Sequence, residues 1–241
     1  MDQKIFIKKE TIQRLIKDVK QIKKEPLTTE NIYYHHDEEN VLKGYALIIG
    51  PEGTPYFGGY YLFILDFPED YPHTPPKVTF VTNGDGIRFN PNLYVDGKVC
   101  ISLLNTWKGE QWTSCQTIST ILLTLGTLLC NNPLLNEPGI HTTHIDFHKY
   151  TKIIEYKNID VAILNILNRH KYSYYSQYTF IQNFDTIMKE KFLENKEKLK
   201  LFVNEKRKES PPEFIKTTIY YMTVWIDYNR LYDKIDLQIK E

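Results

Sequence analysis

The chain has 241 residues, of which 41% are hydrophobic and 14% aromatic, so it can bury a large core. Its 30 basic and 30 acidic residues balance, which argues against a general nucleic-acid binder, because such proteins normally carry a basic excess. No apolar run approaches the roughly eighteen residues that cross a membrane, and residues 1–25 are too charged for a secretion signal. Three cysteines without a CxxC pair indicate free thiols, so we expect a soluble, intracellular protein.

The first predicted element is an amphipathic helix that ends before Pro26. Its apolar stripe has helical spacing and consists of Ile12, Leu15, Ile16, Val19 and Ile22. The opposite face is basic and carries Arg14, Lys17, Lys20 and Lys24. A solvated lysine face is the ordinary interpretation of this pattern, and a docking face for an acidic partner is the alternative.

Four strands and a buried helix are predicted next. Residues 32–36, 41–49, 60–67 and 77–82 are rich in Val, Ile, Tyr and Phe, and tight turns separate them. Strands joined in this way form an antiparallel meander. The nearly all-apolar segment 117–129 predicts a core helix that lies across the sheet.

The segment after residue 150 is predicted to be wholly helical. Apolar and aromatic residues at helical spacing mark three helices, near 161–167, 180–202 and 214–231, with a break at 205–212. Aromatic residues with this spacing are ordinarily packing residues. We therefore divide the chain into a catalytic domain over residues 1–150 and a helical extension over residues 151–241, packed on or beside it, with a supporting or partner-binding role.

The segment 90–112 carries the strongest catalytic signal. Cys100 follows Asn92 by eight residues, and Asp96-Gly97 between them favours a backbone turn. A thiol next to such a turn, with a side-chain amide folded back towards it, is suited to covalent catalysis. The amide supplies a neutral N–H donor where negative charge develops.

Several separate segments of the sequence resemble the ubiquitin-conjugating enzymes. They are Gly-Pro-Glu-Gly-Thr-Pro-Tyr-Phe-Gly-Gly-Tyr over 50–60, Phe-Pro-Glu-Asp-Tyr-Pro over 67–72 followed by Pro75-Pro76, Asn90-Pro91-Asn92, and Cys100. The resemblance covers residues 5–150 and is closest to the large members with a helical C-terminal extension. It implies an α+β fold of the UBC type: an N-terminal helix, a four-stranded antiparallel meander, a core helix and the extension.

The resemblance also implies an activity. Cys100 would accept ubiquitin or a ubiquitin-like protein as a thioester from an ATP-dependent activating enzyme, and pass it to a substrate lysine or to a ligase. Asn92 would position the site and stabilise the oxyanion; the alternative is that Asn92 only hydrogen-bonds the turn before Cys100. We expect no cofactor or metal, neither nucleic acid nor membrane as a partner, and a cytoplasmic location with the nucleus as a second compartment.

Several residues around the expected site depart from the family pattern. Asn90 stands where most members have histidine, a structural hydrogen-bonding residue, and Pro91 follows it. Ser102 is often aspartate elsewhere. Leu135 stands near the position where many members carry an acid that orients the incoming lysine, and Glu137 is the nearest carboxylate. Activation of the amine is therefore expected to depend on a ligase or a substrate.

Two surfaces are expected to bind partner enzymes. The resemblance implies that the activating enzyme docks on the first helix, at Arg14, Lys17 and Lys20. The ligase-facing loops differ from the common pattern: His73 stands where phenylalanine is frequent, and Thr113-Ser114-Cys115 replaces the usual Ser-Pro-Ala. A typical ligase partner is therefore not predicted.

Three other interpretations compete with this one. His141, His144 and His148 would share one face of a helix and could bind a metal, but no cysteine or carboxylate cluster accompanies them. A cysteine hydrolase or isopeptidase could pair Cys100 with one of these histidines, although the protease signatures around the nucleophile are absent. An inactive ubiquitin-binding scaffold is the third, but such variants typically lose the cysteine.

Overall fold

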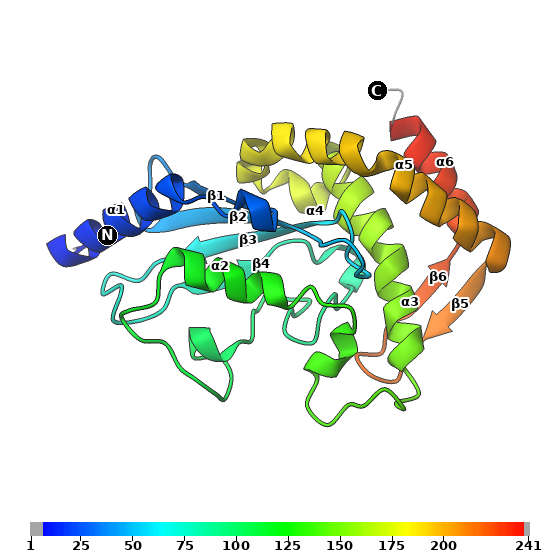
Figure 1. Cartoon of the computed structure of the whole chain (residues 1–241), viewed down its shortest axis with the longest axis horizontal. Helices are drawn as coiled ribbons and strands as arrows, with labels where there is room; N and C mark the ends of the chain where they lie inside the picture. The colour runs from blue at the N-terminus through cyan, green and yellow to red at the C-terminus, as the bar shows by residue number, and fades with distance from the viewer. Residues whose placement is uncertain (1–6, 239–241) are drawn as a thin grey trace.

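The computed structural model describes residues 7–238, and the side chains of residues 7–235 (Figure 1). The N-terminal elements are α1 (Lys9–Lys24), η1 (Thr28–Glu30), β1 (Ile32–His36), β2 (Lys43–Ile49), β3 (Tyr60–Asp66) and β4 (Lys77–Phe80). The four strands form one antiparallel sheet in the order β1-β2-β3-β4. The predicted meander is confirmed, with strand boundaries within two residues of those expected.

The middle and C-terminal elements are mostly helical. They are η2 (Gly84–Gly86), η3 (Ser102–Leu104), α2 (Ile118–Thr127), η4 (Pro133–Asn136), α3 (Phe147–Lys157), the π-helix η5 (Asn158–Asn165), η6 (Arg169–Lys171), α4 (Ser173–Ser176), η7 (Thr179–Phe184), α5 (Asp185–Glu209), β5 (Glu213–Lys216), β6 (Thr223–Ile226) and α6 (Tyr228–Gln238). No helix within residues 7–238 is long and apolar enough to cross a membrane.

The buried face of α1 differs from the predicted apolar stripe. Its buried residues are Thr11, Leu15, Asp18 and Ile22, whereas Ile16 is 46% exposed. Polar contacts explain why Thr11 and Asp18 are buried. The Thr11 hydroxyl donates to the Glu69 carbonyl at 2.8 Å, and the Tyr71 hydroxyl donates to the Asp18 carboxylate. Helix α1 therefore packs through a mixed polar and apolar face.

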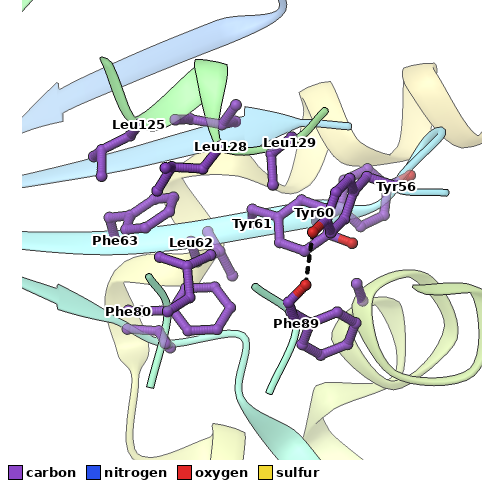
Figure 2. Close-up of a cluster of buried hydrophobic side chains, with 14 of the residues drawn as sticks. Tyr56, Tyr60, Tyr61, Leu62, Phe63, Phe80, Phe89, Leu125, Leu128 and Leu129 are labelled. Carbon is purple, nitrogen blue, oxygen red and sulfur yellow. Dashed lines mark hydrogen bonds between the residues drawn. The ribbon is translucent and has the colours of Figure 1, made fainter. Parts of the chain in front are cut away.

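Strand β3 is the centre of the core, and its residues alternate between the two faces of the sheet. On one face Phe63 lies beside Leu125 of α2 and Leu128, the residue that follows this helix (Figure 2). The Phe63 and Phe80 rings lie on the same side, with centroids 5.5 Å apart. The buried helix predicted over 117–129 thus covers this face.

The extension covers the other face of the sheet. The Tyr60 hydroxyl donates to the Met188 carbonyl in α5 at 2.8 Å, and the Tyr45 ring stacks on Phe180 with centroids 4.4 Å apart. Antiparallel sheets commonly leave one face to water. Because both faces are covered here, residues 60–65 of β3 form a continuous apolar and aromatic run. The extension shares one hydrophobic core with the N-terminal part.

The predicted boundary at residue 150 falls inside a helix. Helix α3 continues directly into η5, and Asn158, the first residue of η5, bonds to the sheet region. Its Oδ1 accepts a hydrogen bond from the Tyr61 hydroxyl at 2.7 Å, and its Nδ2 donates to the Phe57 carbonyl at 2.9 Å. A Cβ atom on Gly59 would lie only 1.9 Å from Asn158 Oδ1, so this close approach requires glycine.

The prediction of a third helix over 214–231 is wrong. Residues Glu213–Lys216 and Thr223–Ile226 pair as an antiparallel hairpin, with Phe214 opposite Trp225, and α6 begins at Tyr228. Exposed and buried side chains alternate along both strands, which is the period of a strand rather than of a helix. The break predicted at 205–212 also begins later, because α5 runs to Glu209.

Candidate active site

Cys100 and Asn92 lie at the two ends of one tight turn. The Gly97 amide donates to the Tyr94 carbonyl at 3.0 Å, and Gly97 has a φ of 88°, a conformation that favours glycine. The Lys98 amide donates to the Asp96 side chain at 3.0 Å. The turn predicted at Asp96-Gly97 is confirmed. Beyond it, the chain returns so that Cys100 comes back alongside Asn92.

Two hydrogen bonds join these residues directly. The Cys100 amide donates to the Asn92 carbonyl at 2.9 Å, and Asn92 Nδ2 donates to the Cys100 carbonyl at 2.6 Å. The side-chain amide therefore rests on the backbone of Cys100, which is the alternative role considered for it. To stabilise an oxyanion on the carbonyl of an acyl group bonded to the sulfur, the amide must move from the Cys100 carbonyl to that oxygen.

The Cys100 thiol is covered by the segment that follows it. It is 4% exposed, and Sγ donates to the Thr106 carbonyl at 2.9 Å. The Thr106 hydroxyl accepts from the Ile101 amide at 2.9 Å and bonds to the Val99 carbonyl at 3.0 Å. Residues 105–111 are all exposed. A large substrate can therefore reach the sulfur only if this segment is displaced.

Two contacts hold the same segment at its other end. Asn105 Oδ1 accepts from the Trp112 amide at 2.9 Å. Gly109 has a φ of 135° and lies so close to Ser102 that a Cβ atom there would be 3.0 Å from the Ser102 Cβ. Ser102, named from the sequence as a site-shaping residue, therefore supports the covering segment.

Asn90 is fully buried and connects the turn between Asn92 and Cys100 to its surroundings. Its Nδ2 donates to the Leu128 carbonyl at 2.8 Å and to the Tyr56 hydroxyl at 3.2 Å. Its Oδ1 accepts from the Asn92 amide at 2.9 Å and from Asn136 Nδ2 at 3.4 Å. These contacts are those of a structural hydrogen-bonding residue.

The loop with Leu135 and Glu137 is linked to the same turn through Asn136. Leu135 is 40% exposed and carries no ionisable group. Glu137 is half-buried, and its carboxylate accepts a hydrogen bond from the Tyr220 hydroxyl. The sequence offered Glu137 as the nearest carboxylate to the incoming amine, and this carboxylate is already hydrogen-bonded to Tyr220 of the extension.

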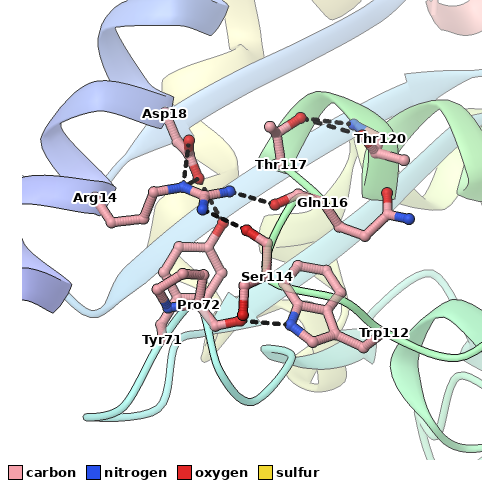
Figure 3. Close-up of polar contacts among 9 residues, drawn as sticks. All are labelled: Arg14, Asp18, Tyr71, Pro72, Trp112, Ser114, Gln116, Thr117 and Thr120. Carbon is pink, nitrogen blue, oxygen red and sulfur yellow. Dashed lines mark hydrogen bonds and ion pairs between the residues drawn. The ribbon is translucent and has the colours of Figure 1, made fainter.

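The sequence placed Arg14 on a basic face of the first helix. In the structure its side chain instead contacts Asp18 and the 114–116 loop (Figure 3). Its Nε lies 2.9 Å from the Asp18 carboxylate, and its two terminal nitrogens donate to the Ser114 carbonyl, at 2.6 Å, and to the Gln116 carbonyl. Arg14 therefore clamps α1 to the 114–116 loop, whereas Lys17 and Lys20 are exposed.

The predicted ligase-facing residues gather next to this clamp. Trp112 Nε1 donates to the Pro72 carbonyl at 2.7 Å, which places the two loops side by side (Figure 3). His73 Nδ1 lies 3.5 Å from the Ser114 hydroxyl. All four residues predicted to face a ligase are exposed: His73, Thr113, Ser114 and Cys115.

Comparison with known proteins decides what this arrangement is. Residues 14–158 match the family model described as ubiquitin-conjugating enzyme. The chain belongs to the ubiquitin-conjugating enzyme family. This confirms the predicted resemblance, and the matched segment contains Asn90, Asn92, Cys100 and the 135–137 loop.

Ubiquitin-conjugating enzymes E2 Z are among the relatives similar to this chain. The chain is 40% identical over 159 residues to ubiquitin-conjugating enzyme E2 Z of Danio rerio, across 65% of this chain and 48% of that protein. It is 40% identical over 157 residues to E2 Z of Homo sapiens, across 64% of this chain and 44% of that protein. The chain spans about half the length of these relatives.

A solved structure supports the fold assignment. The candidate ubiquitin conjugating enzyme from Plasmodium yoelii is similar to this chain with a TM-score of 0.52 and 29% identity, over 65% of this chain and 98% of that one. The predicted α+β architecture of the ubiquitin-conjugating enzymes is therefore confirmed for the N-terminal part of the chain.

The competing interpretations find little support in the site. His144 Nδ1 accepts from the Asp146 amide at 3.1 Å, and the sulfur of Cys100 donates to a carbonyl rather than to a histidine. Helix α3 begins at Phe147, so His141 and His144 lie outside it. Across the part of the chain that the structure describes, no group of three or more His, Cys, Asp or Glu side chains is placed to hold a metal ion.

Three residues near the turn are missed by sequence reasoning: Arg88, Tyr94 and Tyr220. Arg88 and Tyr94 lie on either side of Asn90-Pro91-Asn92, so their position in the chain is a usable signal. Nothing local marks Tyr220, because it reaches the site from the turn between β5 and β6.

Proposed function

We propose that this chain is a ubiquitin-conjugating enzyme that carries ubiquitin or a ubiquitin-like protein as a thioester on Cys100. The modifier is received from an ATP-dependent activating enzyme and passed to a substrate lysine or a ligase. The observation that carries the proposal is the pair of hydrogen bonds that closes Asn92 onto Cys100, within the segment that matches the family.

In the loading step, the Cys100 thiolate attacks the carbonyl carbon of the thioester between the modifier and the activating enzyme. A bond forms between Sγ and this carbon, and the bond to the activating enzyme's sulfur breaks, so that sulfur leaves with its electron pair. Because one thioester replaces another, the step needs no oxidant or reductant. A thiolate is suited to this exchange since it is both a good nucleophile and a good leaving group.

In the transfer step, a neutral amine attacks the same carbon and gives up a proton to water. The bond between this carbon and Cys100 Sγ then breaks, and the sulfur leaves with the electron pair as the thiolate. We expect the Asn92 amide, which donates to the Cys100 carbonyl at 2.6 Å, to leave that carbonyl and donate to the oxyanion that forms between these events. Leu135 offers no acid or base to the incoming amine. A ligase or the substrate itself is therefore expected to complete the site.

The surfaces proposed for the activating enzyme and the ligase are made of exposed side chains. Lys17 and Lys20 remain available on α1 for an acidic surface of the activating enzyme. The loops with His73 and Ser114 would receive a ligase whose contacts differ from the common pattern. A cytoplasmic and nuclear location remains a prediction.

A loading assay tests the proposal. The purified protein is incubated with activating enzyme, modifier and ATP, using a panel of activating enzymes and modifiers, and the products are separated on non-reducing gels. We expect an adduct that thiol reductants remove and that Cys100→Ala abolishes, whereas Cys100→Ser should form an oxyester that resists reduction. A normal reducible adduct on Cys100→Ser, or no adduct on the unsubstituted protein with any pair, would contradict the proposal.

A further inference from the structure

Tyr220, in the turn between β5 and β6, reaches the catalytic turn from the extension. Its hydroxyl donates to the carboxylate of Glu137. Its ring centroid lies 4.5 Å from the guanidinium carbon of Arg88, and its edge meets the Tyr150 ring. One side chain of the extension therefore contacts both segments that border the Asn90-Pro91-Asn92 turn.

Arg88 connects Tyr220 to the turn itself. Its guanidinium carbon lies over two rings, 3.4 Å from the Tyr94 centroid and 4.5 Å from that of Tyr220. One of its terminal nitrogens donates to the Pro91 carbonyl at 2.6 Å. A cation over two aromatic faces is held by attraction to both. The guanidinium is thus clamped against the residue that immediately precedes Asn92.

Glu137 connects Tyr220 to the opposite side of the site. It lies in the loop that follows α2. The Asn136 side chain, in the same loop, donates a hydrogen bond to Asn90. Burial, the hydrogen bond to Glu137 and the charge of that carboxylate raise the pKa of Tyr220 far above the ordinary tyrosine value. The hydroxyl is therefore protonated at neutral pH and can donate to the carboxylate.

The turn that carries Tyr220 is itself firmly held. Asp146 is fully buried, and its Oδ2 accepts from the Thr218 amide at 2.7 Å, the Thr218 hydroxyl at 2.6 Å and the Ile219 amide at 2.9 Å. Tyr220 and Tyr221 both have left-handed backbone conformations, with φ of 59° and 50°. Such a conformation costs about 1 kcal/mol or more for a residue with a side chain, so the surrounding contacts must hold it.

We propose that Tyr220 is a positioning residue for transfer of the modifier from Cys100. It presses Arg88 onto the turn that presents Asn92, and it fixes Glu137 in the loop past which the amine approaches. The extension thereby sets the transfer rate without touching the reacting atoms. The inference rests on the function proposed above.

The experiment compares loading and transfer in matched variants. Tyr220→Phe removes only the hydroxyl, Tyr220→Ala removes the ring as well, and Tyr221→Ala is the control, since Tyr221 is 89% exposed in the same turn. Each protein is first charged with the modifier that loads the unsubstituted protein. The activating enzyme is then quenched, and discharge onto free lysine is followed over a range of lysine concentrations and pH values.

We expect Tyr220→Phe to load at the normal rate and to lower the maximal discharge rate about tenfold, the equivalent of about 1.4 kcal/mol. The lysine concentration that gives half the maximal rate should stay unchanged, and so should the melting temperature. Tyr220→Ala should discharge more slowly still, and Tyr221→Ala should match the unsubstituted protein. In Glu137→Ala, adding Tyr220→Phe should cause little further loss, because both act through one contact.

Other outcomes overturn the inference. Equal discharge by Tyr220→Phe and Tyr221→Ala would show that the hydroxyl does not position the site. An equal fall in loading, discharge and melting temperature for Tyr220→Phe would assign it a purely structural role. Failure of the unsubstituted protein to load at all would instead remove the proposed function, and this inference with it.

Discussion

The side-chain amide of Asn92 donates to the carbonyl oxygen of Cys100 at 2.6 Å, so the proposed oxyanion donor is hydrogen-bonded to the backbone of the proposed nucleophile. In Asn92→Ala we expect loading to persist and discharge onto lysine to fall about a hundredfold, because one oxyanion donor is lost. Single-turnover discharge from the charged variant measures this. If Asn92 only stabilises the turn, loading, discharge and melting temperature should all decline together.

Substitutions of Arg14 and Lys17 should separate a role in stability from a role in docking of the activating enzyme. Arg14→Ala removes the clamp on the 114–116 loop and leaves Asp18, which is 4% exposed, without its cation, so we expect a loss of about 3 kcal/mol in the free energy of unfolding. Lys17→Ala should leave stability unchanged and slow loading by the activating enzyme. Denaturant unfolding and loading rates provide the two measurements.

Lys23→Ala is the matched control for Lys17→Ala, since both lysines are exposed on α1 but Lys23 lies in its last turn and outside the predicted basic face. Equal loading rates for the two variants would argue against docking at Lys17. A stable Arg14→Ala protein would show that the clamp contributes little to the fold.

Asn158 should be required for the junction between the sheet and the extension. Asn158→Ala leaves the Tyr61 hydroxyl and the Phe57 carbonyl without their buried partner, so we expect a loss of about 3 kcal/mol in unfolding free energy. Tyr61→Phe removes one of the two bonds and should lose less. Gly59→Ala should also be destabilised, because its new methyl group collides with Asn158.

Urea unfolding of these three variants provides the measurement. A change below about 0.5 kcal/mol for Asn158→Ala, the range of ordinary surface substitutions, would mean that the junction depends on apolar packing alone.

Asp160 should make stability depend on pH in the acid range. Burial raises the pKa of Asp160, but the ammonium groups of Lys157 and Lys234, at 2.9 and 2.6 Å, outweigh it and hold that pKa below its ordinary value. The contribution of Asp160 to the free energy of unfolding is therefore complete above its pKa in the unfolded chain, about 3.9. This contribution is lost as the pH falls through the lower pKa of the folded state.

The buried carboxyl of Asp146 should behave in the same way. Burial raises its pKa, but hydrogen bonds from Thr218 and Ile219 bring it below the ordinary value. We expect the free energy of unfolding in urea to fall below about pH 4, and Asp160→Asn to show a smaller fall over that range. A decline of equal size in Asp160→Asn and the unsubstituted protein would exclude Asp160 as a source.

Local features of the chain were sufficient to predict much of the fold and the centre of the site. Strand alternation, the apolar segment 117–129 and the Asp96-Gly97 turn depend on neighbouring residues, so their patterns can be read directly from the sequence. Cys100 and Asn92 were identified because the turn that joins them is short. Their catalytic roles remain predictions for the assays above.

The sequence by itself determined the sheet, the core helix and the short turn that brings Cys100 to Asn92, because each depends on residues close together in the chain. Tertiary structure decided what Arg14 clamps, why both faces of β3 are buried, and how Tyr220 reaches Arg88 and Glu137. Those contacts join segments far apart in sequence. The β5–β6 hairpin belongs with them, since its aromatic residues also fit a helical period and only packing selects the strand.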